Sequence, residues 1–146
     1  MRHAVVLSVS LFACSGAVAS RAADTFDAEA AKAGAVLFKI HCANCHGASG
    51  RGDGKAAPGL EFAPADLTRI SERNKGKFPF DRVVQIVDGR KPMKGHGRTD
   101  MPVWGDVLLS QREGYDPAKV KEQIRRLVHH LASIQEAPPA AKPEKS

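Results

Sequence analysis

The stretch that most constrains this chain is Cys42-Ala43-Asn44-Cys45-His46. The C-x-x-C-H spacing places two thiols about one helical turn apart, with an imidazole directly after the second thiol. Two thiols so spaced can form thioethers with both vinyl groups of one porphyrin, and the imidazole is then carried to the iron. The motif therefore predicts one covalent haem c, with Cys42 and Cys45 as thioether sites and His46 as an iron ligand.

Two other uses of a C-x-x-C pair fit this chain less well. A thioredoxin-like redox pair belongs in a βαβ unit, and the sequence has no convincing strand pattern. A zinc site would need a second pair of ligands, but no second C-x-x-C occurs, and the chain has three cysteines in all. Both features favour the haem interpretation.

The N-terminal stretch is typical of an export signal. A short basic start is followed by the apolar run AVVLSVSLFA at residues 4–13 and by the small-x-small sequence Ala17-Val18-Ala19. We expect residues 1–23 to be a signal peptide, which indicates a periplasmic or similarly exported protein. A lipid anchor at Cys14 is the less favoured alternative, because the bulky Phe12, two residues before this cysteine, does not suit lipoprotein processing.

Charge narrows the range of partners. The chain of 146 residues has a formal net charge of +6, and removal of residues 1–23 deletes two arginines and no acid, which leaves 6 − 2 = +4. The cations form no continuous run and few aromatic residues accompany them, so we expect no nucleic acid partner. Beyond the N-terminal stretch no apolar run is long enough for a membrane span. A basic exported haem protein instead favours redox partners with acidic docking faces.

Three stretches have strong helical patterns. Residues 27–40 begin with Asp27 as N-cap, residues 80–88 are followed by the helix stop Gly89, and a last helix covers about 118–135. We expect Asp81 to cap the second helix, and Asp116 with Pro117 to start the third. The third has one apolar stripe, made of Val120, Ile124, Leu127, Val128, Leu131 and Ile134.

The remaining stretches are expected to be loops or ends. Residues 47–57 form a glycine-rich loop, residues 64–68 an extended segment that turns into a short helix, and residues 70–79 a polar irregular stretch. Residues 137–146 are rich in Pro, Ala and Lys and are expected to be disordered. The chain is therefore predicted to be all-α, with about four to five helices around one haem in a domain at 24–136.

The second axial ligand of the iron is less clearly marked. Met101 is the favoured candidate, because Pro102 would stiffen its loop and Trp104 could exclude water from the haem edge. His96, Met93 and an open position remain as alternatives. His41 is expected to face solvent. A histidine ligand usually donates its other ring N–H to a nearby acceptor, and the carbonyl of Pro58, twelve residues after His46 (58 − 46 = 12), is a candidate.

With these residues in place, the chain resembles the class I monohaem cytochromes c over about residues 27–135. The likeness rests on the haem motif and the final helix, together with Gly34, Phe38, Pro58-Gly59-Leu60 and Met101-Pro102. It implies thioethers at Cys42 and Cys45, His46 and Met101 as axial ligands and Pro58 as the acceptor from His46. It also implies a helix crossing in which Gly34 and Phe38 meet Leu127. His130 stands where a tyrosine is usual.

The resemblance implies one-electron transfer rather than an enzymatic reaction of the chain's own. The favoured hypothesis is a periplasmic electron carrier that docks through a basic face near Cys45 and Met101. The alternative is the haem c subunit of a multi-subunit dehydrogenase or oxidase. A haem-based gas sensor is a third hypothesis, which a firm Met101 ligand would oppose.

Overall fold

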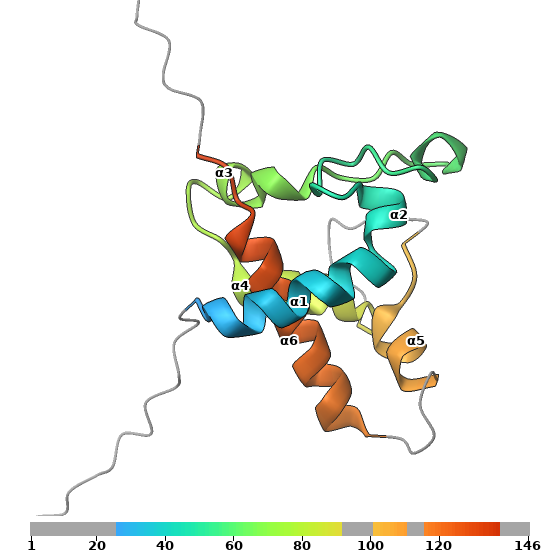
Figure 1. Cartoon of the computed structure of the whole chain (residues 1–146), viewed down its shortest axis with the longest axis vertical. Coiled ribbons are helices and arrows are strands. Elements are labelled where there is room, and N and C mark those ends of the chain that lie inside the picture. The colour runs from blue at the N-terminus through green and yellow to red at the C-terminus, as the bar shows by residue number, and fades with distance from the viewer. Residues whose placement is uncertain (1–25, 92–100, 111–115, 138–146) are drawn as a thin grey trace, which may run out of the picture.

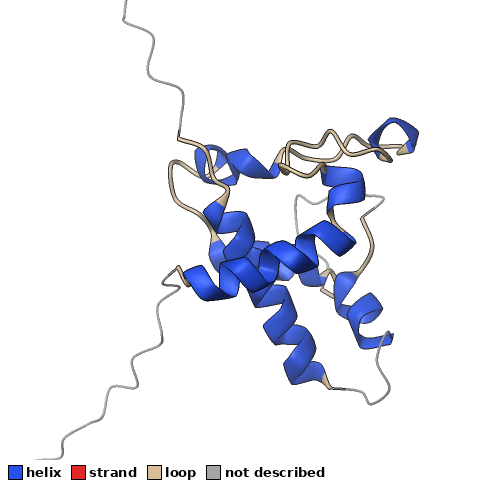
Figure 2. Ribbon diagram, viewed as in Figure 1, coloured by secondary structure: helices blue, strands red, loops and turns tan. Residues whose placement is uncertain are grey.

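The computed structural model describes residues 26–91, 101–110 and 116–137, and every regular element in these ranges is a helix (Figure 2). The two 3₁₀ turns are η1 (Ala57–Gly59) and η2 (Leu67–Arg69). The α-helices are α1 (Ala28–His41), α2 (Ala43–His46), α3 (Ile70–Arg73), α4 (Phe80–Asp88), α5 (Trp104–Ser110) and α6 (Pro117–Ser133). The predicted all-α class is confirmed.

The centre of the fold is the crossing of α1 over α6 (Figure 1). Gly34 lets the two helices approach closely, because a Cβ at this position would collide with the backbone carbonyl of Arg126. One turn later, Phe38 is 2% exposed and its ring centroid lies 5.0 Å from that of His130. Phe38 also packs in the same buried cluster as Leu127. The expected helix contact is therefore present, and His130 supplies its second aromatic ring.

The core forms where α4 and α5 pack against α6. The apolar stripe predicted for α6 is buried except at Ile134, which is partly buried at the end of the helix. Burial of each such side chain contributes roughly 1.5–3 kcal/mol to stability. The stripe is joined in one cluster by residues of the other helices: Phe38, Phe80, Val83, Val87 and Leu108.

Short polar and glycine signals set the helix ends. The Asp27 carboxylate accepts backbone hydrogen bonds from the first turn of α1, and Asp116 does the same for α6, where Pro117 is the first residue. Gly89 ends α4 in the left-handed conformation, with φ of 71°. The prediction that Asp81 caps α4 is wrong: Pro79 occupies the N-cap position and the helix begins at Phe80, so Asp81 lies in its first turn.

Two helices were not predicted. The stretch expected to be irregular begins with the four-residue α3, which continues directly from η2. The single tryptophan opens α5, which has no side-chain signal of the kind that marks α1 and α6. Both are short helices, and α5 places Leu108 in the core. Packing rather than local propensity therefore accounts for α5.

Some predictions concern residues outside this description. The proposed signal peptide, Cys14, and the tail from residue 138 onward lie there. Among the helices that are described, none combines the length and the apolar composition of a membrane-spanning segment.

Candidate functional site

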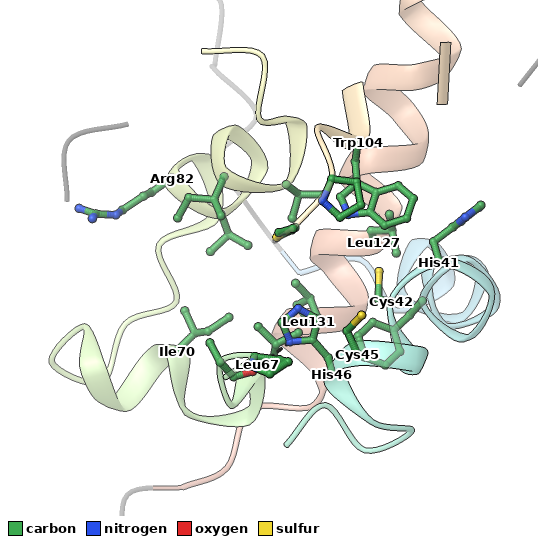
Figure 3. Close-up of a pocket in the computed structure, with 18 of the residues that line it drawn as sticks. His41, Cys42, Cys45, His46, Leu67, Ile70, Arg82, Trp104, Leu127 and Leu131 are labelled. Carbon is green, nitrogen blue, oxygen red and sulfur yellow. Dashed lines mark hydrogen bonds between the residues drawn. The ribbon is translucent and has the colours of Figure 1, made fainter. Parts of the chain in front are cut away.

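The C-x-x-C-H motif occupies the bend between α1 and α2. Cys42 ends α1, and its carbonyl accepts a 2.9 Å hydrogen bond from the backbone N–H of His46. Both cysteines are free thiols, and their sulfur atoms point into one cavity (Figure 3). Burial raises the pKa of the Cys42 thiol to about 12, with a smaller contribution from Cys45, so Cys42 is a neutral thiol at neutral pH.

The cavity has a volume of about 540 Å³. Its lining is predominantly apolar and comes from α1, α3, α4, α6, residues 60–67 and residues 101–104. A volume of this size with a few polar groups is typical of a small-molecule or cofactor site. Among the described lining residues there is no carboxylate.

His46 lies on one wall of the cavity with its orientation fixed by the backbone. Its Nδ1 is 3.0 Å from the carbonyl oxygen of Ala65. A carbonyl can only accept, so Nδ1 carries the proton and Nε2 keeps its lone pair for a metal. The structure thus corrects the acceptor predicted at Pro58, which is exposed in η1 and does not line the cavity.

A folded-back loop explains how Ala65 reaches His46. The backbone N–H groups of Gly52, Gly54 and Ala56 bond in turn to the carbonyls of His46, Cys45 and Asn44, at 2.8, 3.1 and 2.9 Å. Gly52 has φ of 84°, and any Cβ on it would collide with the Pro64 carbonyl. The glycine-rich sequence predicted as a loop is therefore packed tightly against the motif. We call His46 and residues 47–67 the proximal wall.

Another part of the cavity lining comes from the start of residues 101–110, a segment that we call the distal wall. Met101, Pro102 and Trp104 line the cavity, and Met101 is half-buried. The structure therefore brings Met101 to the same cavity as His46. The alternative ligands Met93 and His96 lie outside the described residues.

His41 and the cavity arginines were missed as site residues. His41 was expected to face solvent, but it is half-buried, and its ring centroid lies 5.3 Å from that of Trp104. Arg73 and Arg82 are the two arginines among the described lining residues, and Arg82 lies across the cavity from the cysteines in Figure 3. The contact between His41 and Trp104 joins distant segments, and no local pattern marks it.

The donor set and the cavity fit a haem c. The Cys42 and Cys45 thiols, the His46 imidazole and the Met101 thioether all line one apolar cavity. This set of groups matches covalent attachment of one porphyrin and axial ligation of its iron. Arg73 and Arg82 also line the cavity, and their positive charge suits the two carboxylate groups of a haem. No cluster of metal-ligating side chains suggests a different metal in the described part of the chain.

Comparison with known proteins gives one result. The family model described as Cytochrome c matches residues 31–135, which include the motif, both walls of the cavity and α6. The curated proteins and the solved structures provided no match.

Proposed function

This chain belongs to the cytochrome c family, and from that premise we propose that it is an exported monohaem carrier with His46 and Met101 as axial ligands. The observation that carries the proposal is the meeting of four groups at one cavity: the Cys42 and Cys45 thiols, the His46 imidazole and the Met101 thioether. The family implies covalently bound haem c and haem-based electron transfer.

Each group has a distinct role in holding the haem. Cys42 and Cys45 would provide the thioether sulfurs, and Arg73 with Arg82, which also line the cavity, would pair with the haem carboxylates. The bound haem supplies an iron that alternates between the ferric and ferrous states. Trp104, beside the Met101 segment, excludes water from the cavity.

The hydrogen bond from His46 to Ala65 fixes the proximal ligand. It holds the proton on Nδ1 and would leave Nε2 to ligate the iron of a bound haem. A neutral thioether on the other side favours the ferrous state relative to a second histidine, and so raises the reduction potential. A fixed pair of ligands also limits rearrangement when the electron moves.

A basic face beside the haem motif would receive the redox partner. Lys39 is exposed at the end of α1, and exposed Lys55 follows Gly54, whose N–H bonds to the Cys45 carbonyl. These cations favour a partner with an acidic face, in a weak encounter that salt screens.

A permanent subunit of a larger oxidoreductase is the second candidate. It is favoured by the outer face of α1, where Val36 and Ile40 are 60% and 66% exposed one turn apart. Copurification of the exported protein with a larger subunit at high salt would support this candidate over a free carrier. The proposal of export, with ordinary cleavage rather than a lipid anchor at Cys14, rests on residues 1–23 and is checked by the intact mass of the mature protein.

Visible spectroscopy of the holoprotein tests the ligand assignment. With His46 and Met101 as ligands, the ferric protein shows a weak long-wavelength sulfur-to-iron band that Met101→Ala abolishes. The ferrous Met101→Ala protein then binds carbon monoxide readily, whereas the wild type binds it slowly. A high-spin ferric wild type without the band, and with rapid carbon monoxide uptake, would contradict the proposal and support a gas sensor.

A further inference from the structure

The distal wall is attached to the C-terminal end of α4 at a close backbone contact. Gly89 caps α4 with φ of 71°, and a Cβ on this residue would lie 3.2 Å from the Cα of Val103. Because Val103 follows Met101 by two residues, the end of α4 is close to the proposed iron ligand.

A second contact lies on the other side of Trp104. The Asp88 carboxylate accepts two hydrogen bonds from the Arg90 side chain, from Nε and from Nη2, both at 2.6 Å, and a longer one of 3.3 Å from the Arg90 backbone N–H. A Cβ on buried Gly105 would lie 2.7 Å from the Asp88 oxygen, and closer still to Nε of Arg90. The ion pair therefore lies directly on the backbone of α5, where a Cβ on Gly105 would displace it.

We propose that Asp88 and Arg90 form a clamp that positions Met101 for the iron. The ion pair between Asp88 and Arg90 fixes the end of α4 against Gly105. The contact between Val103 and Gly89 prevents the distal wall from rotating about Gly105. The inference rests on the proposed function, since it concerns the residue assigned there as distal ligand. Asp88 and Arg90 are positioning residues, because neither is among the residues that line the cavity.

A neutral thioether makes such positioning important. It offers the iron no charge, and a small displacement lets a stronger external ligand take its place. An ordinary ion pair at the surface contributes little to stability. The effect of this pair should therefore appear in ligand exchange more than in unfolding.

The chain contains a matched ion pair for comparison. Arg69 and Glu72 also form a fork with two hydrogen bonds, in η2 and α3. Among the glycines that the structure describes, none makes a contact with this pair of the kind found at Gly105. Neutralising Glu72 removes the same type of interaction without touching the distal wall.

The experiment is an imidazole titration of the ferric holoprotein, in which loss of the sulfur-to-iron band measures the binding of imidazole. We expect Asp88→Asn to raise the apparent affinity for imidazole about fivefold, the effect of losing one charge-assisted hydrogen bond. Glu72→Gln should stay within about twofold of the wild type. Gly105→Ala keeps both charges but displaces the clamp, and should raise the affinity as Asp88→Asn does.

The outcomes separate this inference from the ligand assignment. Suppose that the wild type shows the band and that Met101→Ala removes it. If Asp88→Asn and Gly105→Ala then both bind imidazole as the wild type does, the proposed clamp is wrong, whereas the assignment of Met101 as ligand stands. Equal effects of Asp88→Asn and Glu72→Gln would also overturn the clamp. If Asp88→Asn does not fold, Gly105→Ala alone decides. A wild type without the band contradicts the ligand assignment itself.

Discussion

The two walls of the cavity are held in different ways. The proximal wall is a continuous stretch that folds back on the C-x-x-C-H motif through backbone hydrogen bonds, among them Gly52 to His46 and Gly54 to Cys45. The distal wall is held through its contacts with other elements, namely Val103 on Gly89, Gly105 under an ion pair, and Trp104 beside His41. Backbone hydrogen bonds therefore hold the wall of one proposed iron ligand, His46, and contacts between separate elements hold the wall of the other, Met101.

This difference has a consequence for function. A backbone network does not depend on rotamers, so His46 should stay in place through cycles of oxidation and reduction. The distal contacts can loosen one at a time, since each joins a different pair of elements. We therefore expect ligand exchange, where it occurs, to take place at Met101.

The largest loss of stability is expected when a side chain is added to a closely packed glycine of the proximal wall. In Gly54→Ala the new Cβ would collide with backbone atoms of Asn44 and Cys45, which cannot move aside without opening the motif. We expect the holoprotein to lose about 3 kcal/mol of unfolding free energy, at the upper end of the range for overpacking. Denaturant unfolding measures this loss.

Gly59→Ala is the matched control for that substitution. A Cβ on Gly59 would have no atom within 4 Å, and its φ is an ordinary one. Its unfolding free energy should stay within about 0.5 kcal/mol of the wild type. Equal losses in the two variants would mean that the close packing of the loop on the motif does not hold the proximal wall.

A smaller effect is expected for the contact between His41 and Trp104. In His41→Ala the ring pair at 5.3 Å is lost, which should lower the unfolding free energy by about 1 kcal/mol. The sulfur-to-iron band should also weaken, because Trp104 follows Met101 by three residues. His41→Phe keeps an aromatic ring and should retain most of both properties. If His41→Phe is as harmful as His41→Ala, the ring contact is not what stabilises the distal wall.

The sequence predicted those features that depend on local chemistry. Asp27, Asp116 and Gly89 mark helix ends because a carboxylate can bond to free N–H groups and a glycine can take positive φ, wherever the helix lies in the fold. The C-x-x-C-H motif is likewise complete within five residues. The cysteines and the histidine could therefore be placed at one site before any tertiary contact was known.

The features that sequence reasoning missed depend on distant contacts. Every residue offers a carbonyl, so nothing in the sequence distinguishes Ala65 from Pro58 as the acceptor for His46; the path of the intervening loop decides it. Similarly, α5 lacks a capping signal and is stabilised by the burial of Leu108. The contact of His41 with Trp104 joins α1 to α5, which no spacing rule predicts.

The smallest expected effect is a salt-dependent shift in pKa. One carboxylate lies beside each wall, and salt should shift the pKa values of these two carboxylates by different amounts. The hydrogen bond from the Arg90 side chain is the main cause that holds the pKa of Asp88 below its usual value, whereas the Thr68 hydroxyl is the main cause of the lowered pKa of Asp66, next to Ala65, with smaller contributions from the charges of Arg51 and Arg73. Each carboxylate stabilises the fold above its ordinary pKa, and this contribution is lost as the pH falls through the lowered value. Salt screens an ion pair more than a bond to a neutral hydroxyl.

Raising the salt concentration should therefore move the pKa of Asp88 upward toward its ordinary value, and move that of Asp66 less. Carboxyl NMR titrations of the holoprotein at low salt and in about 1 M sodium chloride would measure both shifts. The acid pH at which the sulfur-to-iron band begins to weaken should rise together with the pKa of Asp88, since the distal wall loses its clamp when that carboxylate is protonated. Equal salt-induced pKa shifts at the two carboxylates would show that charge does not distinguish the two walls. The same conclusion would follow if the pH at which the band weakens did not change with the pKa of Asp88.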